Sequence, residues 1–364
     1  MRTFGVEEEF LLLSKARSEL RPEADDVVEE SDRSAGGGRG DVEHELMQEQ
    51  AEIGSVPCAT SAELRSDLVR LRSNLADAAT AEGVRVLASG VSPVPVETTT
   101  TDSDRYRRMI NAFALVARQQ ATCGQHVHVS VESRNEGVGV LDRIAPWLPV
   151  VRALAANSPY WQGADTGYAS YRTILWGQWP TAGPTPPFRD AAGYDGIVAE
   201  LIASGAAVDD GMIYFDARLS ANYPTVEIRV ADVCTNLDDA VLVAVLGRGL
   251  VETAAASWRC GDAAPDVRPE LLRAASWRAA RWGLTGSLWD PTTRALATAS
   301  EVLDRLVDHV GAALRASGDE DFAREQVERI GRDGTGAEQQ RRAFGAGGGI
   351  DGVLDDVVAR TTQW

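Results

Sequence analysis

Carboxylate, imidazole and guanidinium side chains occur at alternate positions in four apolar segments of this 364-residue chain. Glu7 and Glu9 are two residues apart in the first segment, and His126 and His128 are two apart in a later one. Because side chains alternate across a β-strand, residues i and i+2 project from the same face. The candidate set is Glu7, Glu9, Glu45, Glu49, Glu52, His126, His128, Glu227 and Arg229. Its three glutamates within residues 42–54 are alternatives to one another.

This set could bind a divalent cation together with a phosphorylated ligand. Mg²⁺ prefers several oxygen ligands and usually keeps water and substrate phosphate in its coordination shell. A histidine among carboxylates also suits Mn²⁺, and the absence of a regularly spaced Cys/His cluster disfavours zinc. Arg229, two residues after Glu227, would pair with a transferring phosphoryl group or with a substrate carboxylate.

Each feature also has a purely structural interpretation. The run Glu7-Glu8-Glu9 is compatible with a solvated strand edge, and the two histidines with core or surface positions. Glu227 and Arg229 are compatible with a simple ion pair. Their joint occurrence on strands with an apolar reverse face favours a site over these alternatives.

Strand-like and helix-like patterns alternate over the first 130 residues and would position these side chains. Residues 4–13 and 42–54 have strand patterns. Thr60 and Glu63 form a candidate capping box, leucines follow at helical spacing, and Gly83 ends that helix. The other expected elements are strands at 84–89, 124–131, 212–219 and 225–232 and a helix at 106–117.

Three other regions have distinctive compositions. Residues 157–189 are dense in Gly, Pro, Trp and Tyr, which predicts an ordered lid or binding loop. Its aromatic residues either form the core of the loop or stack on a ligand. The glycine-rich stretches 32–41 and 344–350 are expected to be flexible connections rather than phosphate loops. From Asn236 onward, helical periodicity dominates.

We therefore predict an α+β fold with a mainly antiparallel sheet, one face of which lines a polar cavity. Charges at alternate positions argue against a parallel doubly wound sheet, whose strands read as continuous apolar runs. The length permits one large domain or two closely joined ones. We expect a single catalytic domain over residues 1–364, with a strand-rich core at about 1–235 and a helical part at about 236–364.

Composition narrows the ligand class and the compartment. The net charge of −18 argues against nucleic-acid binding through a basic surface. Lys15 is the only lysine, so any phosphate must be bound by arginine and metal rather than by a lysine phosphate loop. Three acids stand where a signal peptide needs apolar residues, and no run approaches the roughly 18 apolar residues of a membrane span. Four cysteines without C-x-x-C spacing favour a reduced compartment, so we expect a cytoplasmic protein.

Five motifs around these residues occur in the order found in one protein family. They are G-V-E-E-E-F at 5–10, C-G-Q-H-V-H-V at 123–129, A-N-S-P-Y-W-Q-G at 156–163, D-T-G-Y-A-S-Y-R at 165–172 and Y-P-T-V-E-I-R-V-A-D at 223–232. The likeness runs over nearly the whole chain. The sequence resembles the bacterial carboxylate–amine ligases, the second family of glutamate–cysteine ligases.

The resemblance implies a fold similar to glutamine synthetase and the guanidino kinases, with the active site on the concave face of a curved antiparallel sheet. It also implies that ATP phosphorylates the γ-carboxylate of glutamate and that an amine, cysteine by default, then attacks the γ-glutamyl phosphate. The implied metal ligands are Glu7, Glu9, Glu52, His126 and Glu227. Arg229, with His128 as a second choice, would contact the nucleotide. Arg172 would contact a substrate carboxylate or phosphate, and Glu45 and Glu49 are second choices for the metal.

Two other functions stay open on this sequence. One is a ligase for a different acid–amine pair, or a phosphotransferase, on the same fold. The other is a catalytically silent nucleotide-binding protein, against which the intact polar set argues. The expected partners are small molecules, and the family suggests a homodimer. Glu227→Ala is expected to abolish turnover with little loss of fold.

Overall fold

A seven-stranded sheet, in which every pairing is antiparallel, forms the centre of the computed structural model, which describes residues 1–35 and 40–364. Along the sheet the order is β2 (Val42–His44), β3 (Gln50–Gly54), β1 (Phe4–Ser14), β5 (Gly124–Ser130), β9 (Thr225–Asp232) and β8 (Ala217–Leu219). β4 (Val84–Leu87) pairs with the C-terminal part of β1. The predicted α+β class with an antiparallel sheet is confirmed.

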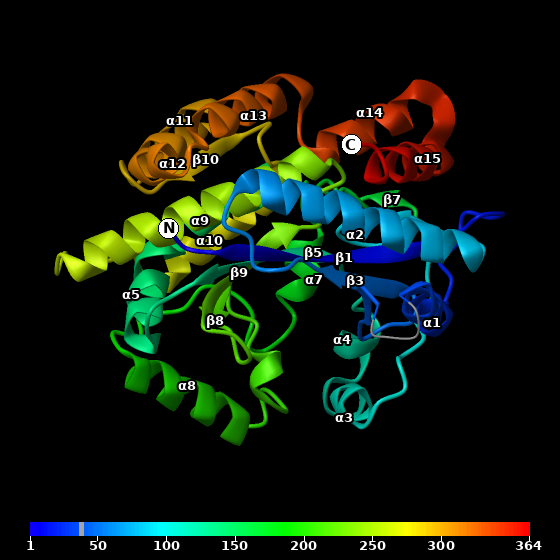
Figure 1. Ribbon diagram of the computed structural model, residues 1–364, viewed down its shortest axis with the longest axis horizontal. Coiled ribbons are helices and arrows are strands. Elements are labelled where there is room, and N and C mark those ends of the chain that lie inside the picture. The colour runs from blue at the N-terminus through cyan, green and yellow to red at the C-terminus, as the bar shows by residue number, and fades with distance from the viewer. Residues whose placement is uncertain (36–39) are drawn as a thin grey trace.

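Helices cover the two faces of the sheet very differently (Figure 1). On one face lie α2 (Ser61–Ala81) and α9 (Leu237–Arg259), and beyond them α11 (Ala299–His309), α12 (Gly311–Ser317), α13 (Glu320–Asp333), α14 (Gly336–Ala343) and α15 (Gly349–Thr361). The other face is flanked by α3 (Asp104–Phe113), α4 (Leu115–Arg118), α7 (Arg172–Trp176) and α8 (Ala191–Ala203). The remaining elements are α1 (Ala24–Ser34), α5 (Arg134–Ile144), α6 (Leu148–Leu154), α10 (Pro269–Trp282), β6 (Tyr160–Trp161) and β7 (Ala164–Asp165).

The helix α9 closes the apolar core behind the sheet. Gly247 of α9 lies so close to β5 and β9 that a Cβ there would stand 3.2 Å from Val127 and 3.4 Å from Ile228. The helix segment Leu237–Cys260 is long and apolar enough to cross a membrane, so the expectation that no run approaches a span was wrong. Because 78% of its most apolar window is buried inside the structure, α9 is a core helix.

Helix α2 follows the sequence prediction closely. The Thr60 hydroxyl accepts a hydrogen bond from the Glu63 N–H, and the Glu63 carboxylate accepts one from the Thr60 N–H, which completes the capping box. Gly83, at a φ of 77°, turns the chain after the helix. The leucines of the helix are buried against the sheet.

Several predicted elements are divided in the structure. Residues 42–54 form two short paired strands rather than one, because the chain turns back between them. The expected helix at 106–117 breaks at Ala114, whose φ of 50° cannot continue an α-helix. Of the expected strand 212–219, Ala217–Leu219 alone is a strand, after a 3₁₀ turn at Asp210–Met212.

The C-terminal third is helical, as expected, with one addition. A hairpin of β10 (Ser287–Asp290) and β11 (Ala295–Thr298) interrupts it. The predicted loop 344–350 is a helical turn between α14 and α15, with Gly347 at a φ of 101°. The predicted loop 32–41 falls partly on residues 36–39, which lie outside the described residues. The lid-like stretch 157–189 contains β6, β7 and α7.

Candidate active site

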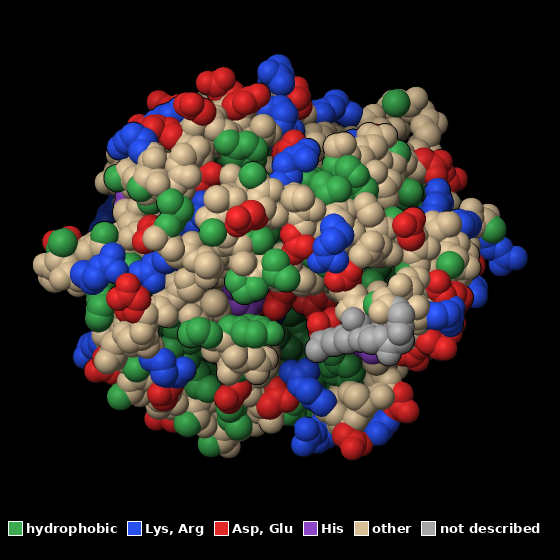
Figure 2. Space-filling view, viewed as in Figure 1, with side chains coloured by type: hydrophobic (Ala, Val, Ile, Leu, Met, Phe, Trp, Pro, Cys, Tyr) green, Lys and Arg blue, Asp and Glu red, His purple; other side chains and the backbone are tan. Residues whose placement is uncertain are grey.

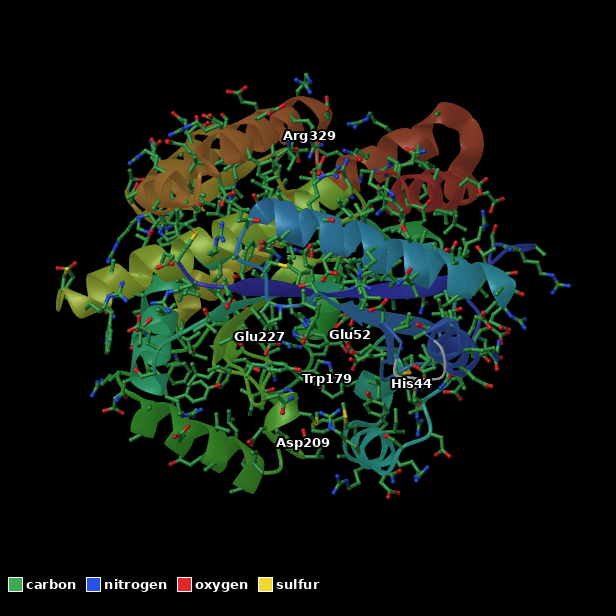
Figure 3. All side chains as sticks on the ribbon, in the orientation of Figure 1. His44, Glu52, Trp179, Asp209, Glu227 and Arg329 are labelled. Carbon is green, nitrogen blue, oxygen red and sulfur yellow. The ribbon has the colours of Figure 1, made fainter. Side chains whose placement is uncertain are left out.

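The register of the central strands gathers the predicted residues on the face of the sheet opposite α2 and α9. Directly paired across neighbouring strands are Glu9 with Glu52, Glu7 with His126, and His128 with Glu227. Figure 3 shows Glu52 and Glu227 on the side of the sheet away from α2. The alternation of side chains between the two faces, as predicted from the sequence, is therefore the one found in the structure.

A cavity of about 1390 Å³ lies against this face, and Figure 2 shows its mouth with acidic and histidine side chains inside. Its volume is above the roughly 300–1,000 Å³ of common small-molecule pockets. Among the predicted residues, those that line it are Glu7, Glu9, Glu45, Glu52, His126, His128 and Arg229. The cavity has room for more than one small molecule.

Glu7 stands between the two histidines of β5. Its Oε2 lies 3.2 Å from Nδ1 of His126, and its Oε1 lies 3.3 Å from Nε2 of His128. Burial alone would raise the pKa of Glu7, but the two imidazoles outweigh it and hold the pKa below its ordinary value. For His126, burial and the nearby Arg229 guanidinium lower the pKa to about 4. Glu7 is therefore an anion beside a neutral imidazole at neutral pH.

Three carboxyl groups crowd together at the β3 side of the cavity. Glu9, Glu45 and Glu52 each place an oxygen within 4.8 Å of the others. Burial, followed by repulsion from Glu45, raises the pKa of Glu9 to about 8, and the same two causes raise the pKa of Glu52 well above its ordinary value. The Gly124 N–H donates to Glu9 at 2.6 Å. A cation among these groups would offset their mutual repulsion.

Two arginines hold Glu227 at the β9 side. Arg218 of β8 donates to its two oxygens at 2.7 and 3.2 Å, and Arg229 donates to Oε1. These charges outweigh burial and lower the pKa of Glu227. The expectation for Glu227→Ala stays a prediction; the two guanidinium groups that would lose their carboxylate add an expected cost in stability.

The donor set fits a hard divalent cation. Three groups each bring ligand atoms within 4.8 Å of one another: Glu7, His128 and Glu227; Glu7, Glu52 and His126; and Glu9, Glu45 and Glu52. The Nε2 atom of His126 is buried without a hydrogen-bond partner, with Oε1 of Glu9 3.6 Å away. Carboxylate oxygens with imidazole nitrogens match Mg²⁺ and Mn²⁺ preferences.

Three of the predicted residues, Arg172, Glu49 and Glu227, do not line the cavity; Glu227 is joined to it through Arg218 and Arg229. The Arg172 guanidinium is buried behind Gly124, where a Cβ would stand 2.3 Å from its Nη2, and its ring neighbour is Trp176, 5.2 Å away. Its Nε and Nη2 have no hydrogen-bond partner. The Glu49 carboxylate accepts a hydrogen bond from the Thr99 N–H at 3.0 Å, and this bond is part of the protein's own structure. Among the alternatives of 42–54, Glu52 and Glu45 therefore face the cavity and Glu49 does not.

The structure also adds residues that the sequence did not indicate. Arg218 binds Glu227, and Arg105 of α3 pairs with Asp209 at 2.7 Å across the cavity wall. An isolated arginine in a short strand or at a helix start carries no spacing signal. The Glu227 pairing would follow from the β8–β9 register, which needs the fold first.

The fold assigns the chain to a class of proteins. It superposes on a glutamate–cysteine ligase from Francisella tularensis, solved in complex with AMP, with a TM-score of 0.66 and 12% identity over 100% of this chain and 89% of that one. It also superposes on a bifunctional glutathione synthetase from Pasteurella multocida, with a TM-score of 0.68 and 12% identity over 99% of this chain and 52% of that one. The class is therefore that of the glutamate–cysteine ligase fold.

Sequence comparison identifies the family. The model of "Glutamate-cysteine ligase family 2 (GCS2)" matches residues 3–360. The chain is 51% identical to the "Putative glutamate–cysteine ligase 2-2" of Frankia alni, over 100% of this chain and 97% of that protein. It is 45% identical to the "Putative glutamate–cysteine ligase 2-1" of Paenarthrobacter aurescens, over 100% of this chain and 96% of that protein. The chain belongs to glutamate–cysteine ligase family 2, a family of carboxylate–amine ligases.

Proposed function

We propose that this chain is an ATP-dependent ligase that activates the γ-carboxylate of glutamate and joins it to an amine, with cysteine as the default acceptor. The observation that carries the proposal is the patch of carboxylates and imidazoles, with Arg229 beside it, on the floor of a cavity of about 1390 Å³. Family membership supports ligation. The Francisella tularensis structure of the same fold, described as a complex with AMP, supports a nucleotide.

The proposed reaction suits side chains that bind charge rather than attack carbon. A carboxylate is a poor acyl donor, and phosphorylation gives it a leaving group. Phosphoryl transfer asks a protein mainly for positioning and charge neutralisation. Mg²⁺, or Mn²⁺, would supply that neutralisation, held by Glu7, Glu9, Glu52, His126 and Glu227. No nucleophilic Ser, Cys or Lys is needed, which agrees with a chain that contains one lysine.

The arginines would bind the anionic parts of the reactants. Arg229 lines the cavity, is fixed at Nη1 by Glu227, and keeps an Nε without a hydrogen-bond partner, so it would bind phosphate. Arg172 would attract a substrate carboxylate or phosphate from behind Gly124, since its Nε and Nη2 also lack partners. His128 is the second contact for the nucleotide.

The test is an incubation with Mg-ATP, glutamate and a panel of amines that includes cysteine. The proposal expects ADP when acid and amine are both present, and mass spectrometry then shows the amide. A stable phosphorylated product without an amide would make the protein a phosphotransferase. No ATP turnover with any pair, and no heat on titration with Mg-ATP, would overturn the proposal.

The cytoplasmic compartment and the homodimer expected from the family stay predictions. Sedimentation analysis of the purified protein would test the dimer. Fractionation of cells that express the full chain would test the compartment.

A further inference from the structure

An ion pair joins two segments of the cavity wall that are far apart in the sequence. Nε of Arg105, in α3, donates to Oδ2 of Asp209 at 2.7 Å, and its Nη2 donates to Oδ1 at 3.0 Å. Both residues line the cavity. In Figure 3, Asp209 lies farther from the sheet than Glu52 and Glu227 do. The two-point pairing therefore fastens α3 to the segment around Asp209 on the side of the cavity away from the sheet.

Helix α3 depends on such surface contacts for its position. Of its ten described residues, Met109 alone is buried. The helix ends where Ala114 adopts a φ of 50°, so α3 and α4 are two short helices rather than one long one. Most helical stability in proteins comes from packing of an apolar face, and elements with few buried apolar side chains open more easily than the core. Loss of the ion pair should therefore let α3 move while the protein stays folded.

A second arginine holds the turn that follows Asp209. Nη1 of Arg218 donates to the carbonyls of Gly211 and Ile213, each at 3.1 Å. A Cβ on Gly211 would stand 2.6 Å from Nη2 of Arg105, so the glycine leaves room for that guanidinium. The turn at Asp210–Met212 thus lies against Arg105 and is hydrogen-bonded to Arg218.

The same Arg218 connects the turn to the β9 side of the cavity. Its Nε and Nη2 donate to Glu227 at 2.7 and 3.2 Å, and Nη1 of Arg229 donates to the same carboxylate. Arg229 lines the cavity. An uninterrupted series of hydrogen bonds and close contacts therefore runs from α3 through the turn and Glu227 to Arg229. Energetic coupling between separate parts of a protein is carried by networks of this kind.

We propose that the Arg105–Asp209 pair is a latch that holds α3 against the cavity, and that Arg218 transmits the latched position to Glu227 and Arg229. Arg105, Asp209 and Arg218 are then positioning residues, which act on the reactants through Arg229. The effect on turnover rests on the proposed ligase function, whereas the latch itself does not.

The first test breaks the ion pair and then rebuilds it with the charges exchanged. In Arg105→Asp, amide hydrogen exchange of residues 104–113 should become about twofold to fivefold faster, the effect of losing one partly exposed ion pair. The kcat of the same variant should fall about tenfold, as small misplacements near a reacting centre do. The double variant Arg105→Asp with Asp209→Arg should restore slow exchange and most of the kcat. Exchange is measured by mass spectrometry, and kcat from the formation of ADP.

Arg65→Asp is the matched control. Nε of Arg65, in α2, donates to Asp238 of α9 at 2.7 Å, on the face of the sheet opposite the cavity. The side chains of this pair are 42% and 33% exposed, against 36% and 33% for Arg105 and Asp209. The control makes the same change of charge, and it should leave kcat and the exchange of residues 104–113 at their wild-type values.

The second test asks whether Arg218 transmits the position of α3. Arg218→Lys keeps the charge but loses the planar group that binds Glu227 and the turn together. If the latch acts through Arg218, adding Arg105→Asp to Arg218→Lys should lower kcat further by no more than about twofold, because coupled residues give non-additive effects. A further tenfold loss in the double variant would overturn the transmission.

The outcomes separate this inference from the ligase function. If wild-type protein turns over no acid–amine pair, the ligase function fails, and the exchange rates of residues 104–113 still decide the latch. Wild-type exchange in Arg105→Asp, or fast exchange in the charge-exchanged double variant, would overturn the latch. Restored exchange without restored kcat would also overturn the proposal, because Arg105 would then act on a substrate directly. Should Arg105→Asp unfold, Asp209→Asn removes the opposite charge at the same size and takes its place.

Discussion

Charged residues of the same kinds have different roles on the two faces of the central sheet. On the face under α2, Glu8 receives two hydrogen bonds from Arg72, at 2.9 and 2.5 Å. Nη1 of Arg72 donates to the Thr235 carbonyl at 3.0 Å, and Nη2, which also donates to Glu8, donates to the Cys234 carbonyl at 2.8 Å. Every polar atom of that guanidinium is engaged, so the pair holds the fold together.

The cavity face keeps polar atoms unengaged. Nε2 of His126 and Nε of Arg229 are both buried without a hydrogen-bond partner. Three consecutive glutamates of β1 therefore separate by face: Glu8 is a structural residue, and Glu7 and Glu9 line the cavity. Position on the cavity face, rather than residue type, distinguishes the groups that a ligand can reach from groups that stabilise the protein.

The largest contrast is expected between two arginines. Arg229→Met should lower kcat by about 10³-fold or more, since it removes a cation next to the transferring phosphoryl group. Arg72→Met should instead lower the free energy of unfolding by about 3–5 kcal/mol, because it leaves Glu8 buried and unpaired. Kinetics on the folded fraction and urea unfolding of both variants would measure this. Equal loss of kcat in the two would contradict the division between faces.

The glutamates of β1 give the next contrast. Glu7→Gln should lower kcat by about 10²–10³-fold, as the loss of one electrostatic group in an active site does, and should barely change unfolding. Glu8→Gln, of identical size, should cost about 3–5 kcal/mol of stability, because Arg72 loses its counter-charge. Titration with Mg²⁺ should show weaker binding for Glu7→Gln alone. Unaltered Mg²⁺ binding and kcat in Glu7→Gln would remove Glu7 from the site.

Strand alternation explains why the sequence predicted so much of this site. A period of two places Glu7 and Glu9, or His126 and His128, on one face without knowledge of the fold. The helix α2 was predictable because its capping box and its glycine stop are local signals.

What the sequence could not predict depends on register and turns. The turn that divides 42–54 directs Glu49 away from the cavity and leaves Glu45 in it. Arg218 reaches Glu227 through the pairing of β8 with β9, and Arg172, at the start of α7, lies behind Gly124. None of these positions follows from local periodicity.

The crowded carboxyls of the cavity face predict how stability depends on pH. Glu9 has a pKa of about 8 in the folded protein, above its ordinary 4.5, so the unfolded chain binds fewer protons between these values. Stability of the metal-free protein should therefore fall as pH rises toward 8. His126, with a pKa of about 4, acts in the opposite direction, but only below its ordinary 6.5. Between pH 6.5 and 8, the change in stability therefore comes from the carboxyl cluster.

Thermal unfolding in a chelator across this window would measure the effect. The melting temperature should decrease with pH in wild-type protein, decrease less in Glu9→Gln, and recover when Mg²⁺ is added. An increase of melting temperature between pH 6.5 and 8 would show that Glu9 is ionised throughout.

The smallest contrast compares Gly124, at the start of β5 in the sheet, with Gly247 of α9, which packs against the sheet. A Cβ on Gly124 would stand 2.3 Å from Nη2 and 2.8 Å from Cζ of Arg172, so Gly124→Ala must displace a buried guanidinium. We expect kcat/KM to fall about tenfold, as small misplacements of charged groups near a reaction do. A Cβ on Gly247 of α9 meets Val127 at 3.2 Å, and the gain in helix propensity of about 1 kcal/mol offsets that contact. Gly247→Ala should keep wild-type kcat/KM and change unfolding by at most about 1 kcal/mol. Because Arg172 does not line the cavity, wild-type kinetics in a folded Gly124→Ala protein would show that its charge does not act on the substrates.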